Sequence, residues 1–383
     1  MSELSYLEKL LDGVKVEWLP LAKVCRLING RAYKQEELLS KGKYPVLRVG
    51  NFFTNQNWYY SDLELDQDKY CDNGDLLYAW SASFGPRIWH GGKSIYHYHI
   101  WKVVPDSNLI CKQFLYYLLQ WDTKALKDAH STGSTMMHIS KTTIEKRLVP
   151  IPCPDNPEKS LAIQSEIVRI LDKFTALTAE LTAELNMRKK QYNYYRDQLL
   201  SFKEGEVEWK TLGDISIKIA SGRNKSRKSE GEYPVYGSTG LIGSTDKAAY
   251  SGKLILVARV GAYAGLVNAV AGHFDVSDNT LIIQPSDRWN VRFAFHQLTY
   301  MNLNQYAVGA GQPLITGGFL KNLMVPLPSL DEQTRIANIL DKFDTLTNSI
   351  TEGLPREIEL RQKQYEYYRD MLFSFPKPEV AEA

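Results

Sequence analysis

One helical phrase occurs twice in this chain of 383 residues. It reads RKKQYNYYRDQLLSF at 188–202 and RQKQYEYYRDMLFSF at 361–375. A phrase that returns in the same context marks an internal repeat, which has to be recognised before single elements are assigned. The chain is therefore predicted to contain two copies of one structural unit.

Each copy of the phrase ends a long segment with the periodicity of a coiled-coil helix. Apolar and aromatic residues recur over 167–199 at alternating steps of four and three, with charged residues between them. The second copy begins at Ile336 and contains one extra step of four residues, next to Gly353 and Pro355. Such an insertion is a stutter, which unwinds a supercoil locally, and proline removes a hydrogen bond of the helix. We expect a kink or a break at this place.

The segments that precede the two long helices also resemble each other. Three phrases recur in order: VEW at 16–18 and 207–209, YPV at 44–46 and 233–235, and LVPIP at 148–152 with LMVPLP at 323–328. Both segments are rich in Val, Ile, Tyr and Trp and are interrupted by Gly, Asn, Ser and Pro, as is typical of strands and turns. The expected strands are DLLYAWS (75–81), SIYHYHIWKVV (94–104), KLILVARV (253–260) and NTLIIQP (279–285), and the expected short helices are FLYYLLQW (114–121) and FAFHQLTYM (293–301).

The order of these segments predicts an α+β protein in which two mixed α/β blocks alternate with two long helices. The expected parts are a first block at 1–155, a central helical spacer at 156–205, a second block at 206–328 and a C-terminal helical spacer at 329–383. The opening segment YLEKLLDGVKVEW (6–18) resembles YYRDQLLSFKEGEVEW (194–209), so the repeat is circular. A circular repeat indicates a pseudo-two-fold arrangement with the two helices as an antiparallel coiled coil. A gene duplication that makes no use of its symmetry is the alternative.

The basic residues are concentrated in the two blocks. The whole chain carries a net charge of only +2, but residues 18–150 and residues 210–328 each carry +5, and residues 329–383 carry −4. Two basic surfaces facing an anion, with the helices facing protein, would explain this distribution. An excess of this size also occurs on ordinary domains, so charge alone does not decide the function.

Nothing in the sequence predicts a membrane protein. No run of about 18 apolar residues occurs, so no membrane span is expected, and the N-terminal residues lack the basic and apolar regions of a signal peptide. The four cysteines, at positions 25, 71, 111 and 153, stand far apart. They indicate small buried thiols in a reducing compartment rather than a disulfide or a metal site. A cytoplasmic location is expected.

Two similar but non-identical basic blocks, held apart by a stiff spacer, suit double-stranded DNA with two different half-sites, because half-sites are read about one helical turn (~34 Å) apart. In the second block, a Gly/Ser/Asn-rich loop at 221–231 presents cations that could meet phosphates or guanine edges. The candidate DNA-binding residues are Arg223, Lys225, Arg227, Lys228, Arg259 and Gln312 in the second block, and Arg31, Lys34 and Arg87 in the first. The segments at 80–89 and 130–140 of the first block correspond to 258–267 and 307–316 of the second. A solvated surface loop is the alternative for each.

No catalytic signature is complete. The chain lacks the [DN]PP[YFW] and F-x-G-x-G motifs of adenine methyltransferases, and GGKS at 91–94 lacks the first glycine of a P-loop. The HYH segment at 97–99 lacks the further His and Cys residues of a zinc site, so a packed or hydrogen-bonded pair is the preferred interpretation. The sequence therefore predicts a binding subunit with no catalytic and no metal residues.

The repeated motifs resemble those of one known family. RILDKF (169–174) with KKQYNYYRD (189–197), RIANILDKFDTLTN (335–348) with RQKQYEYYRD (361–370), TAELTAEL (178–185) and VPIPCPDNPEKSLAIQSEIVRIL (149–171) are similar to segments of the specificity subunits of type I restriction–modification systems. The last two are similar to the IC class of these subunits. The resemblance covers essentially the whole chain and implies that the two blocks are target-recognition domains.

The resemblance also implies the function and the partners. A specificity subunit is a non-catalytic chain that reads a bipartite, asymmetric DNA sequence and docks two modification (methyltransferase) subunits, which bind S-adenosylmethionine. Restriction subunits with translocase and nuclease activity, which use ATP and Mg²⁺, would join this core. No cofactor is expected in the chain itself. The recognition domains are the variable part of the family, so the DNA contacts are not transferred from it.

Two helical segments carry further expectations. Each TAEL unit would add about 6 Å and about 40° beyond a full turn to the helix, so an added unit should lengthen the non-specific spacer of the target; an alanine-rich helix of arbitrary length is the alternative. Tyrosine and arginine are common interface anchors. The candidate partner-binding residues are Tyr192, Tyr195, Arg196, Tyr365, Tyr368 and Arg369. Plain coiled-coil packing would explain the tyrosines equally well.

Two other functions fit the same architecture. A stand-alone bipartite DNA-binding regulator should bind its site without partners. A structural scaffold that binds only protein should show little salt-dependent affinity for DNA.

Overall fold

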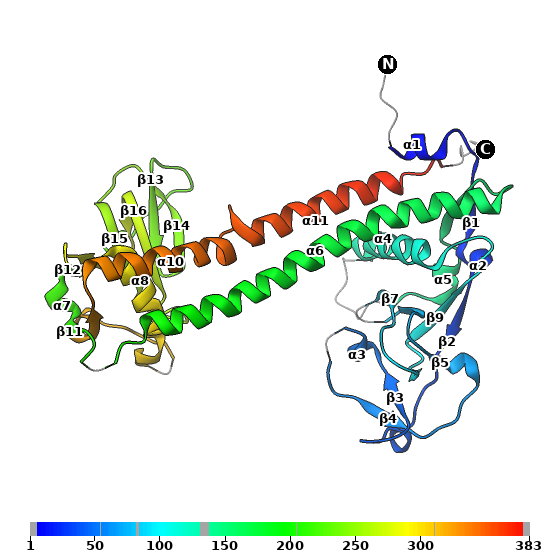
Figure 1. The fold of residues 1–383 in the computed structure, drawn as a ribbon, viewed down its shortest axis with the longest axis horizontal. Helices are drawn as coiled ribbons and strands as arrows, with labels where there is room; N and C mark the ends of the chain where they lie inside the picture. The colour runs from blue at the N-terminus through cyan, green and yellow to red at the C-terminus, as the bar shows by residue number, and fades with distance from the viewer. Residues whose placement is uncertain are drawn as a thin grey trace. The chain divides into compact units, whose positions relative to one another are not determined.

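The computed structural model describes residues 6–53, 55–81, 84–130, 138–203, 205–309 and 311–377. Its contacts divide the chain into two compact units (Figure 1). Unit 1 comprises Met1–Thr178 and Arg361–Ala383, and unit 2 comprises Ala179–Leu360. Each unit contains one mixed α/β block together with parts of the long helices, which confirms the predicted α+β layout.

The block of unit 1 contains two four-stranded sheets and a two-stranded ribbon. One sheet has the order β2 (Cys25–Asn29), β9 (Ile100–Pro105), β6 (Leu76–Ala79), β7 (Gly85–Ile88). The other has the order β4 (Tyr59–Ser61), β3 (Tyr44–Leu47), β8 (Ser94–Tyr96), β5 (Tyr70–Cys71). The ribbon pairs β1 (Val16–Pro20) with β10 (Leu148–Pro152). All neighbouring strands are antiparallel except β3 and β8, which are parallel.

Helices cover these strands. They are α1 (Tyr6–Leu11), α2 (Leu21–Val24), α3 (Val49–Phe53), α4 (Lys112–His130) and α5 (Lys141–Glu145), with 3-10 turns at Gln35–Glu37 and Gln67–Lys69. Helix α4, with 19 residues, is longer than the short helix predicted at 114–121. The side chain of Ser140 caps α5 by accepting a hydrogen bond from the Thr143 N–H. The largest core cluster joins α4 to the first sheet and the ribbon, with Phe114 and Tyr78 fully buried.

The block of unit 2 repeats this plan with its two sheets joined. A single six-stranded sheet has the order β12 (Ser216–Ser221), β17 (Thr280–Pro285), β15 (Tyr250–Ala258), β16 (Val267–Val276), β13 (Tyr233–Gly237), β14 (Gly240–Thr245). The ribbon pairs β11 (Glu208–Thr211) with β18 (Met324–Leu327). The long strand β16 takes the places that β7 and β8 occupy in unit 1, since it pairs with β15 at one end and with β13 at the other.

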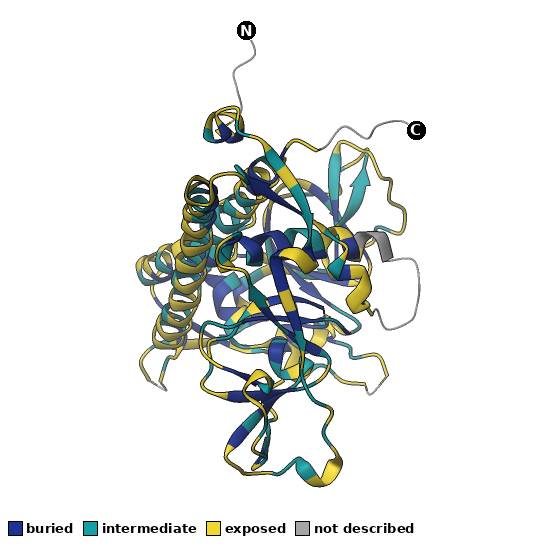
Figure 2. Ribbon diagram, turned by 90° about the vertical axis from the view of Figure 1, so that its right-hand side faces the viewer, coloured by how far each residue is buried: buried dark blue, intermediate teal, exposed yellow. Residues whose placement is uncertain are grey.

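The short helices of unit 2 begin at side-chain caps. They are α7 (Leu212–Ile215), α8 (Val291–Tyr300) and α9 (Gly317–Asn322), with a 3-10 turn at Leu303–Tyr306. The Asn290 side chain accepts hydrogen bonds from the Arg292 and Phe293 N–H groups and so starts α8. Figure 2 shows buried residues gathered in the strands and the helices that cover them, while much of the long-helix surface is exposed.

The long helices are α6 (Pro157–Leu200), α10 (Leu330–Asn348) and α11 (Gly353–Leu372). The predicted break is confirmed, because α10 ends and α11 begins where the four extra residues stand. Gly353 has a φ of +75°, and a Cβ there would lie 2.4 Å from the carbonyl oxygen of Thr345. Only glycine therefore fits at the start of α11.

Each unit contains one stacked contact between its two long helical segments. In unit 1, where α6 and α11 run antiparallel (Figure 1), the ring of Phe174 stacks on Tyr368 with centroids 5.2 Å apart. In unit 2, Phe343 of α10 stacks on Tyr195 of α6 at 5.6 Å. These residues occupy equivalent places in the repeat, so the predicted circular repeat is confirmed. The Trp18 indole N–H also donates to the Pro376 carbonyl at 2.7 Å, as expected if the C-terminal segment packs beside the N-terminal one.

One expected strand is wrong. The segment 94–104 forms two strands, β8 and β9, rather than one. The Ile100 N–H bonds back to the His97 carbonyl at 2.9 Å and closes a turn over residues 97–99. The β-forming side chains of YHYHI favour a strand locally, but the pairing of β8 with β3 and of β9 with β2 requires the chain to turn between them.

Candidate nucleic-acid interface

The basic loop predicted in unit 2 joins β12 to β13, and its four cations are exposed. The loop is attached to the sheet at two points. The Arg223 N–H donates to the Val276 carbonyl at 3.0 Å, and the backbone of Lys228 pairs with Ser244 through hydrogen bonds of 2.9 and 3.0 Å. The Lys228 ammonium forms an ion pair with Asp246. Arg223, Lys225 and Arg227 are therefore the cations that the loop presents most directly to an anion.

The structure brings Arg259 to the same sheet edge as Arg223. Arg259 is half-buried at the end of β15, and its N–H donates to the Asn279 carbonyl at 2.9 Å. Its own carbonyl accepts from the Ile315 N–H at 2.8 Å. Gln312 is exposed in the segment just before Ile315. Two of the predicted cations thus flank one turn, at residues 277–279.

The predicted cations of unit 1 differ in availability. The Arg31 guanidinium donates to both carboxylate oxygens of Glu37, at 2.7 and 2.9 Å, and lowers the pKa of Glu37 to about 2. A phosphate would have to compete with this ion pair for Arg31. Lys34 is exposed, with Nζ 3.7 Å from Glu36, and Arg87 is exposed on β7 with its guanidinium over the ring of Phe53.

Unit 1 contains an aromatic and imidazole cluster that the sequence did not identify as a site. The ring of His99 lies 4.9 Å from His97 and 4.8 Å from Trp80, and the ring of His138 lies 5.9 Å from Trp80. Burial lowers the pKa of His97 to about 4, helped by the neighbouring His99, and burial likewise lowers the pKa of His99. In the sequence, the HYH segment and the segments at 80–89 and 130–140 were noted separately, and nothing indicated that Trp80 and His138 lie beside HYH.

The candidate docking tyrosines of unit 2 contact the other helical segment of their own unit. Tyr195 stacks on Phe343, Tyr192 packs near the same ring at 6.3 Å, and the Arg196 guanidinium lies over Tyr192 and Tyr300 at 5.8 Å from each centroid. Packing between the helical segments therefore accounts for many of the contacts of these side chains. Docking of a partner through them stays a prediction.

The equivalent residues of unit 1 show the same arrangement. Tyr368 stacks on Phe174, Tyr365 packs against the core, and Arg369 lies over Tyr365 at 5.7 Å while pairing with Asp370. Arg369 is only 8% exposed, so little of it faces outward.

A second pair of tyrosines on the same helices is more exposed to solvent than Tyr195 (45%) and Tyr368 (38%). Tyr194 is 62% exposed and Tyr367 is 67% exposed, and they hold equivalent positions in the repeated phrase. Neither residue was predicted as a docking residue, because the heptad pattern indicates the residues of the seam between helices and not those beside it.

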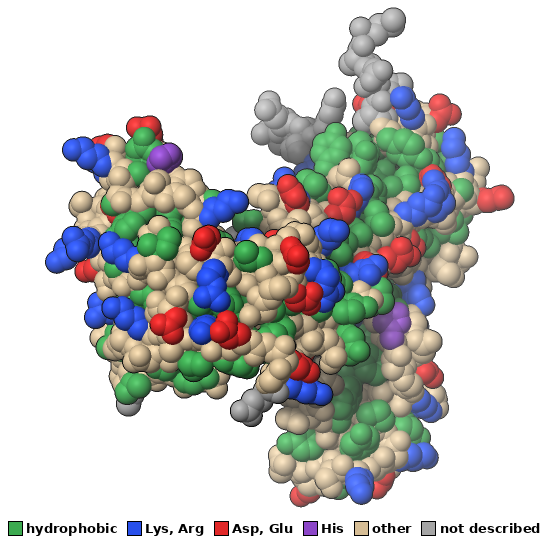
Figure 3. Space-filling model, turned by 60° about the vertical axis from the view of Figure 1, so that its left-hand side comes forward, with side chains coloured by type: hydrophobic (Ala, Val, Ile, Leu, Met, Phe, Trp, Pro, Cys, Tyr) green, Lys and Arg blue, Asp and Glu red, His purple; other side chains and the backbone are tan. Residues whose placement is uncertain are grey.

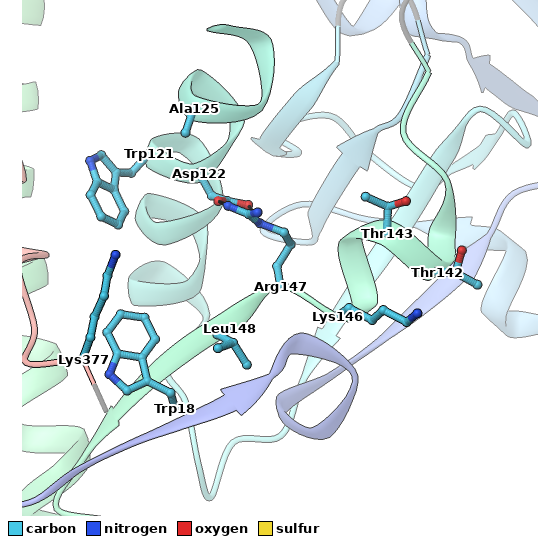
Figure 4. Close-up of a pocket in the computed structure, with 10 residues that line it drawn as sticks. All are labelled: Trp18, Trp121, Asp122, Ala125, Thr142, Thr143, Lys146, Arg147, Leu148 and Lys377. Atoms are coloured by element: carbon cyan, nitrogen blue, oxygen red, sulfur yellow. Dashed lines mark hydrogen bonds and ion pairs between the residues drawn. The ribbon is translucent and has the colours of Figure 1, made fainter. Parts of the chain in front are cut away.

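Unit 1 also contains a cavity of about 880 Å³ (Figure 4). Trp18 and Trp121 line one side with Lys377 beside them, and Arg147 reaches across to Asp122. The Arg147 Nε–H donates to both oxygens of Asp122, at 2.9 and 3.0 Å. This ion pair occupies the guanidinium, so the cavity offers indole faces and ammonium groups but no nucleophile with a base beside it.

The described residues offer no metal site, and acidic side chains accompany the basic ones on the face seen in Figure 3. No group of three or more His, Cys, Asp or Glu side chains in those ranges is arranged to hold a metal ion. Figure 3 shows Lys and Arg side chains distributed singly over the face in view, with Asp and Glu between them. Among the described helices, none combines the length and the apolar composition that crossing a bilayer requires.

Comparison with known families decides what this architecture is. Residues 14–188 and 204–360 match, as two copies, the family model described as type I restriction modification DNA specificity domain. The chain belongs to this family. The two matched segments follow the two blocks and their helices, so each copy of the repeat corresponds to one copy of the specificity domain.

Curated relatives agree over nearly the full length. The chain is 42% identical over 418 aligned residues to the type I restriction enzyme EcoR124I/EcoR124II specificity subunit of Escherichia coli, covering 99% of both chains. It is 44% identical to the EcoprrI specificity subunit of Escherichia coli, covering 92% of this chain and 93% of that one. Sequence-specific DNA recognition within a type I restriction–modification system, without catalysis by the chain itself, is the function of this family member.

Solved structures show the same fold. The S subunit of a type I restriction-modification system from M. genitalium superposes with a TM-score of 0.65 at 16% identity, covering 96% of this chain and 98% of that one. A second solved chain, from a structure described as the structural basis of complex assembly and conformational transition of the type I R-M system, superposes with a TM-score of 0.56 at 16% identity. The match covers 94% of this chain and 97% of that one. The arrangement of two mixed blocks with long helices is therefore shared with these subunits.

Proposed function

We propose that each unit of this specificity subunit reads one half of a bipartite, asymmetric DNA target. The chain would position two modification (methyltransferase) subunits on that target, and restriction subunits would join them. The observation that carries this proposal is that both units attach their mixed block to the long helices through equivalent contacts, while the exposed loops of the two blocks carry different side chains.

A buried glutamine makes the attachment in each unit. In unit 1, the Gln164 Oε1 accepts from the Cys111 N–H and its Nε2 donates to the Leu109 carbonyl, both at 2.9 Å. In unit 2, the Gln333 Oε1 accepts from the Asn290 N–H at 2.8 Å and its Nε2 donates to the Arg288 carbonyl at 3.1 Å, which are the equivalent bonds. The Gln333 Nε2 also donates to the Pro328 carbonyl at 2.8 Å. Both side chains are fully buried. Since buried amides are strongly directional partners, each block is fixed on its helix in the same way.

An aromatic contact repeats in the same manner. Phe375 meets Phe114 in unit 1 with ring centroids 6.3 Å apart, and Phe202 meets Phe293 in unit 2 at 6.5 Å. The C-terminal segment after α11 therefore completes unit 1 as the segment after α6 completes unit 2. The two blocks are attached equivalently but expose different side chains. This favours two half-sites of different sequence on one DNA duplex.

The partners follow from the duplication. Two equivalent helical surfaces suit two copies of one partner, and Tyr194 and Tyr367, at equivalent positions on those surfaces, are more exposed (62% and 67%) than their neighbours Tyr195 and Tyr368 (45% and 38%). S-adenosylmethionine would be bound by the modification subunits, and ATP and Mg²⁺ by the restriction subunits. Because the substrate is cellular DNA, the assembly would work in the cytoplasm.

The TAELTAEL segment lies in the middle of α6, where unit 1 ends at Thr178 and unit 2 begins at Ala179. A third TAEL unit would lengthen the helix by about 6 Å there without changing a contact inside either block. The spacer between the half-sites should therefore lengthen, while the base sequence of each half-site stays the same. An unchanged spacer in methylation mapping of the three-unit variant would contradict this role.

The decisive experiment is to reconstitute the chain with its methyltransferase subunits and S-adenosylmethionine and to map methylated adenines on genomic DNA. The expected motif has two specified parts of different sequence, separated by unspecified bases. A single contiguous motif or a palindromic one would contradict the proposal. Binding of the same motif with equal affinity by the chain alone would instead favour the stand-alone regulator.

The docking surface is tested separately by alanine substitution of Tyr194 and Tyr367, one at a time and together. Each single variant should lose one bound methyltransferase subunit, and the double variant both, in a native mass measurement. Tyr263→Ala is the matched control, since Tyr263 is 57% exposed on the block of unit 2. Intact assembly of the double variant would exclude these residues as anchors.

A further inference from the structure

We infer that each unit reads bases through side chains held on one shared backbone frame at the edge of its block. The readers are Arg259, Asp278 and Asn279 in unit 2, and Tyr98, His99 and His138 in unit 1. The inference rests on the proposed function, in which each unit reads one half-site, and it adds the residues that distinguish the bases.

The frame in unit 1 is a set of backbone hydrogen bonds around the turn at 97–99. The bonds run from Gly30 N to Ile100 O (3.1 Å), Arg31 N to Tyr96 O (3.0 Å), Trp80 N to His99 O (3.0 Å), His97 N to Leu47 O (2.9 Å), Ile100 N to His97 O (2.9 Å) and Ile139 N to Trp80 O (3.0 Å). They join five segments that are far apart in the sequence. The turn and its neighbours at 80 and 138 are therefore fixed relative to one another.

The same six bonds occur in unit 2. They run from Gly222 N to Thr280 O (2.9 Å), Arg223 N to Val276 O (3.0 Å), Arg259 N to Asn279 O (2.9 Å), Ser277 N to Tyr236 O (2.9 Å), Thr280 N to Ser277 O (3.1 Å) and Ile315 N to Arg259 O (2.8 Å). Each bond joins positions equivalent to those in unit 1. Residues 277–279 thus correspond to 97–99, Arg259 to Trp80, and Leu314 to His138.

A glycine lets the frame close in both units. A Cβ at Gly30 would lie 2.3 Å from the Tyr96 carbonyl oxygen, and a Cβ at Gly222 would lie 2.2 Å from the Ser277 carbonyl oxygen. Any other residue would push the early loop away from the turn. The backbone is thus kept the same in both units while the side chains on it differ.

The side chains of unit 2 on this frame match the hydrogen-bonding edges of bases in the major groove. Asp278 and Asn279 are exposed at the turn, and the half-buried Arg259 stands beside them. Arginine pairs with guanine O6 and N7, asparagine with adenine N6 and N7, and a carboxylate accepts from cytosine N4. Ser277 is only 6% exposed and belongs to the frame rather than to the readers.

The readers of unit 1 are phenol and imidazole side chains, without a guanidinium or a carboxylate. Tyr98 and His138 are exposed and His99 is half-buried, while His97 lies deeper and stacks with Tyr33 at 6.4 Å. The Trp80 indole N–H donates to the Tyr98 carbonyl at 2.8 Å, so Trp80 positions the turn. Neutral imidazole and phenol groups both donate and accept hydrogen bonds. Unit 1 should therefore discriminate bases without a guanidinium or carboxylate contact, unlike unit 2.

The flanking cations have a separate role in this scheme. Arg223, Lys225 and Arg227 stand in the exposed loop next to the turn. Cations that meet phosphates raise affinity for all sequences alike and increase the salt dependence of binding. Reading and phosphate contact can therefore be separated by substitution.

The test uses the full chain reconstituted with its methyltransferase subunits, with affinities measured for the wild-type target and every single-base variant of it. Asp278→Asn, Asn279→Ala and Arg259→Lys should each reduce discrimination at one or two positions of one half-site by roughly 10- to 100-fold. The lysine variant keeps the charge but lacks the two-pronged geometry of the guanidinium. The other half-site should be unaffected.

Matched controls identify non-specific effects. Asp287→Asn removes an exposed carboxylate of unit 2 away from the frame, and it should change no base preference. Arg227→Ala should weaken binding to all sequences equally and reduce the salt dependence. The reciprocal variant, Tyr98→Asp with His99→Asn, should change the preferred bases in the half-site of unit 1 alone.

The outcomes separate the two levels of inference. If the wild-type complex recognises a single contiguous motif, the proposed function fails. If it recognises a two-part motif but the reader variants keep every base preference, only the assignment of the readers is overturned. A loss of affinity that is equal for all sequences, in variants whose thermal unfolding matches wild type, would also overturn that assignment.

Discussion

The two units place the same carboxylate of the long helix against different partners from the block. In unit 1, the Tyr117 hydroxyl donates to the Asp172 Oδ1 at 2.5 Å. In unit 2, the His296 Nε2 lies 2.6 Å from the Asp341 Oδ1, which also accepts from Arg292 at 2.7 Å. The helical residue is constant, and the block has changed its donor while keeping the contact.

This difference separates what the repeat keeps from what it varies. The glutamine and aspartate of the helix, the aromatic contact and the backbone frame at the edge occur in both units. The side chains that face outward from the frame differ. A specificity subunit built in this way can change the bases that it reads without changing how its blocks are held, and the following variants test that separation.

The largest loss of stability is expected from Gln164→Leu and Gln333→Leu. Each substitution leaves buried backbone groups at the start of α4 or α8 without partners, which should cost about 2–4 kcal/mol of unfolding free energy. Denaturant unfolding of the full chain measures it. Gln67→Leu and Gln305→Leu, at exposed positions, should change stability little. A similar small change in the buried variants would contradict the equivalence of the two attachments.

A somewhat smaller loss is expected from Gly30→Ala and Gly222→Ala. The added Cβ would overlap carbonyl oxygens of the frame, and relief of that overlap should cost on the order of 1–3 kcal/mol. Gly92→Ala and Gly311→Ala are the controls, because a Cβ there has no neighbour within 4 Å. If the frame glycines tolerated alanine as well as the controls do, the close approach would not define the frame.

The pH response of unit 2 should depend on His296. Burial lowers the pKa of this imidazole, although Asp341 opposes the effect, and Arg292 lowers it further. Since an unfolded histidine has a pKa of about 6.5, the unfolded chain binds more protons, and stability should fall as the pH drops below about 6.5. The variant His296→Tyr gives unit 2 the residue type that unit 1 has at Tyr117 and removes the histidine that would be protonated. Its thermal unfolding temperature should therefore fall less than that of the wild type between pH 7.5 and pH 5.5. Unit 1 keeps its own acid response through His97, whose pKa is lowered to about 4.

The smallest effect is expected from the stacked pairs between helical segments. A double-mutant cycle of Tyr195→Ala and Phe343→Ala should give a coupling of about 0.5–1.5 kcal/mol, and the cycle of Tyr368→Ala and Phe174→Ala should give the same within error. Tyr263→Ala combined with Phe343→Ala should be additive. Unequal coupling in the two units would indicate that the helical segments are not packed equivalently.

Much of the fold could be predicted because it depends on local periodicity. The repeated heptads over 167–199, the extra step beside Gly353 and the YPV phrases at 44–46 and 233–235 each specify an element through neighbouring residues. The break between α10 and α11 was predicted for this reason. The turn at 97–99 was missed, because alternating aromatic residues favour a strand until pairing with other strands decides otherwise.

The site was predicted less completely. Arg223 and Arg259 could be selected as cations in glycine-rich segments. Their convergence on the turn at 277–279 depends on the hydrogen bonds Arg223 N–Val276 O and Arg259 N–Asn279 O, which join positions 53 and 20 residues apart. The ion pair that engages Arg31 with Glu37, and the greater exposure of Tyr194 than of Tyr195, likewise follow from packing.

By itself, the sequence determined that this chain is a doubled α+β protein with long helices between unlike basic blocks, because repeats and periodicity are properties of neighbouring residues. Only the tertiary structure decided which side chains share one surface. Residues near 30, 80, 98 and 138 in one unit, and near 222, 259, 278 and 314 in the other, come together through backbone hydrogen bonds between distant segments. No local pattern encodes such bonds, because each of them depends on how the whole block folds.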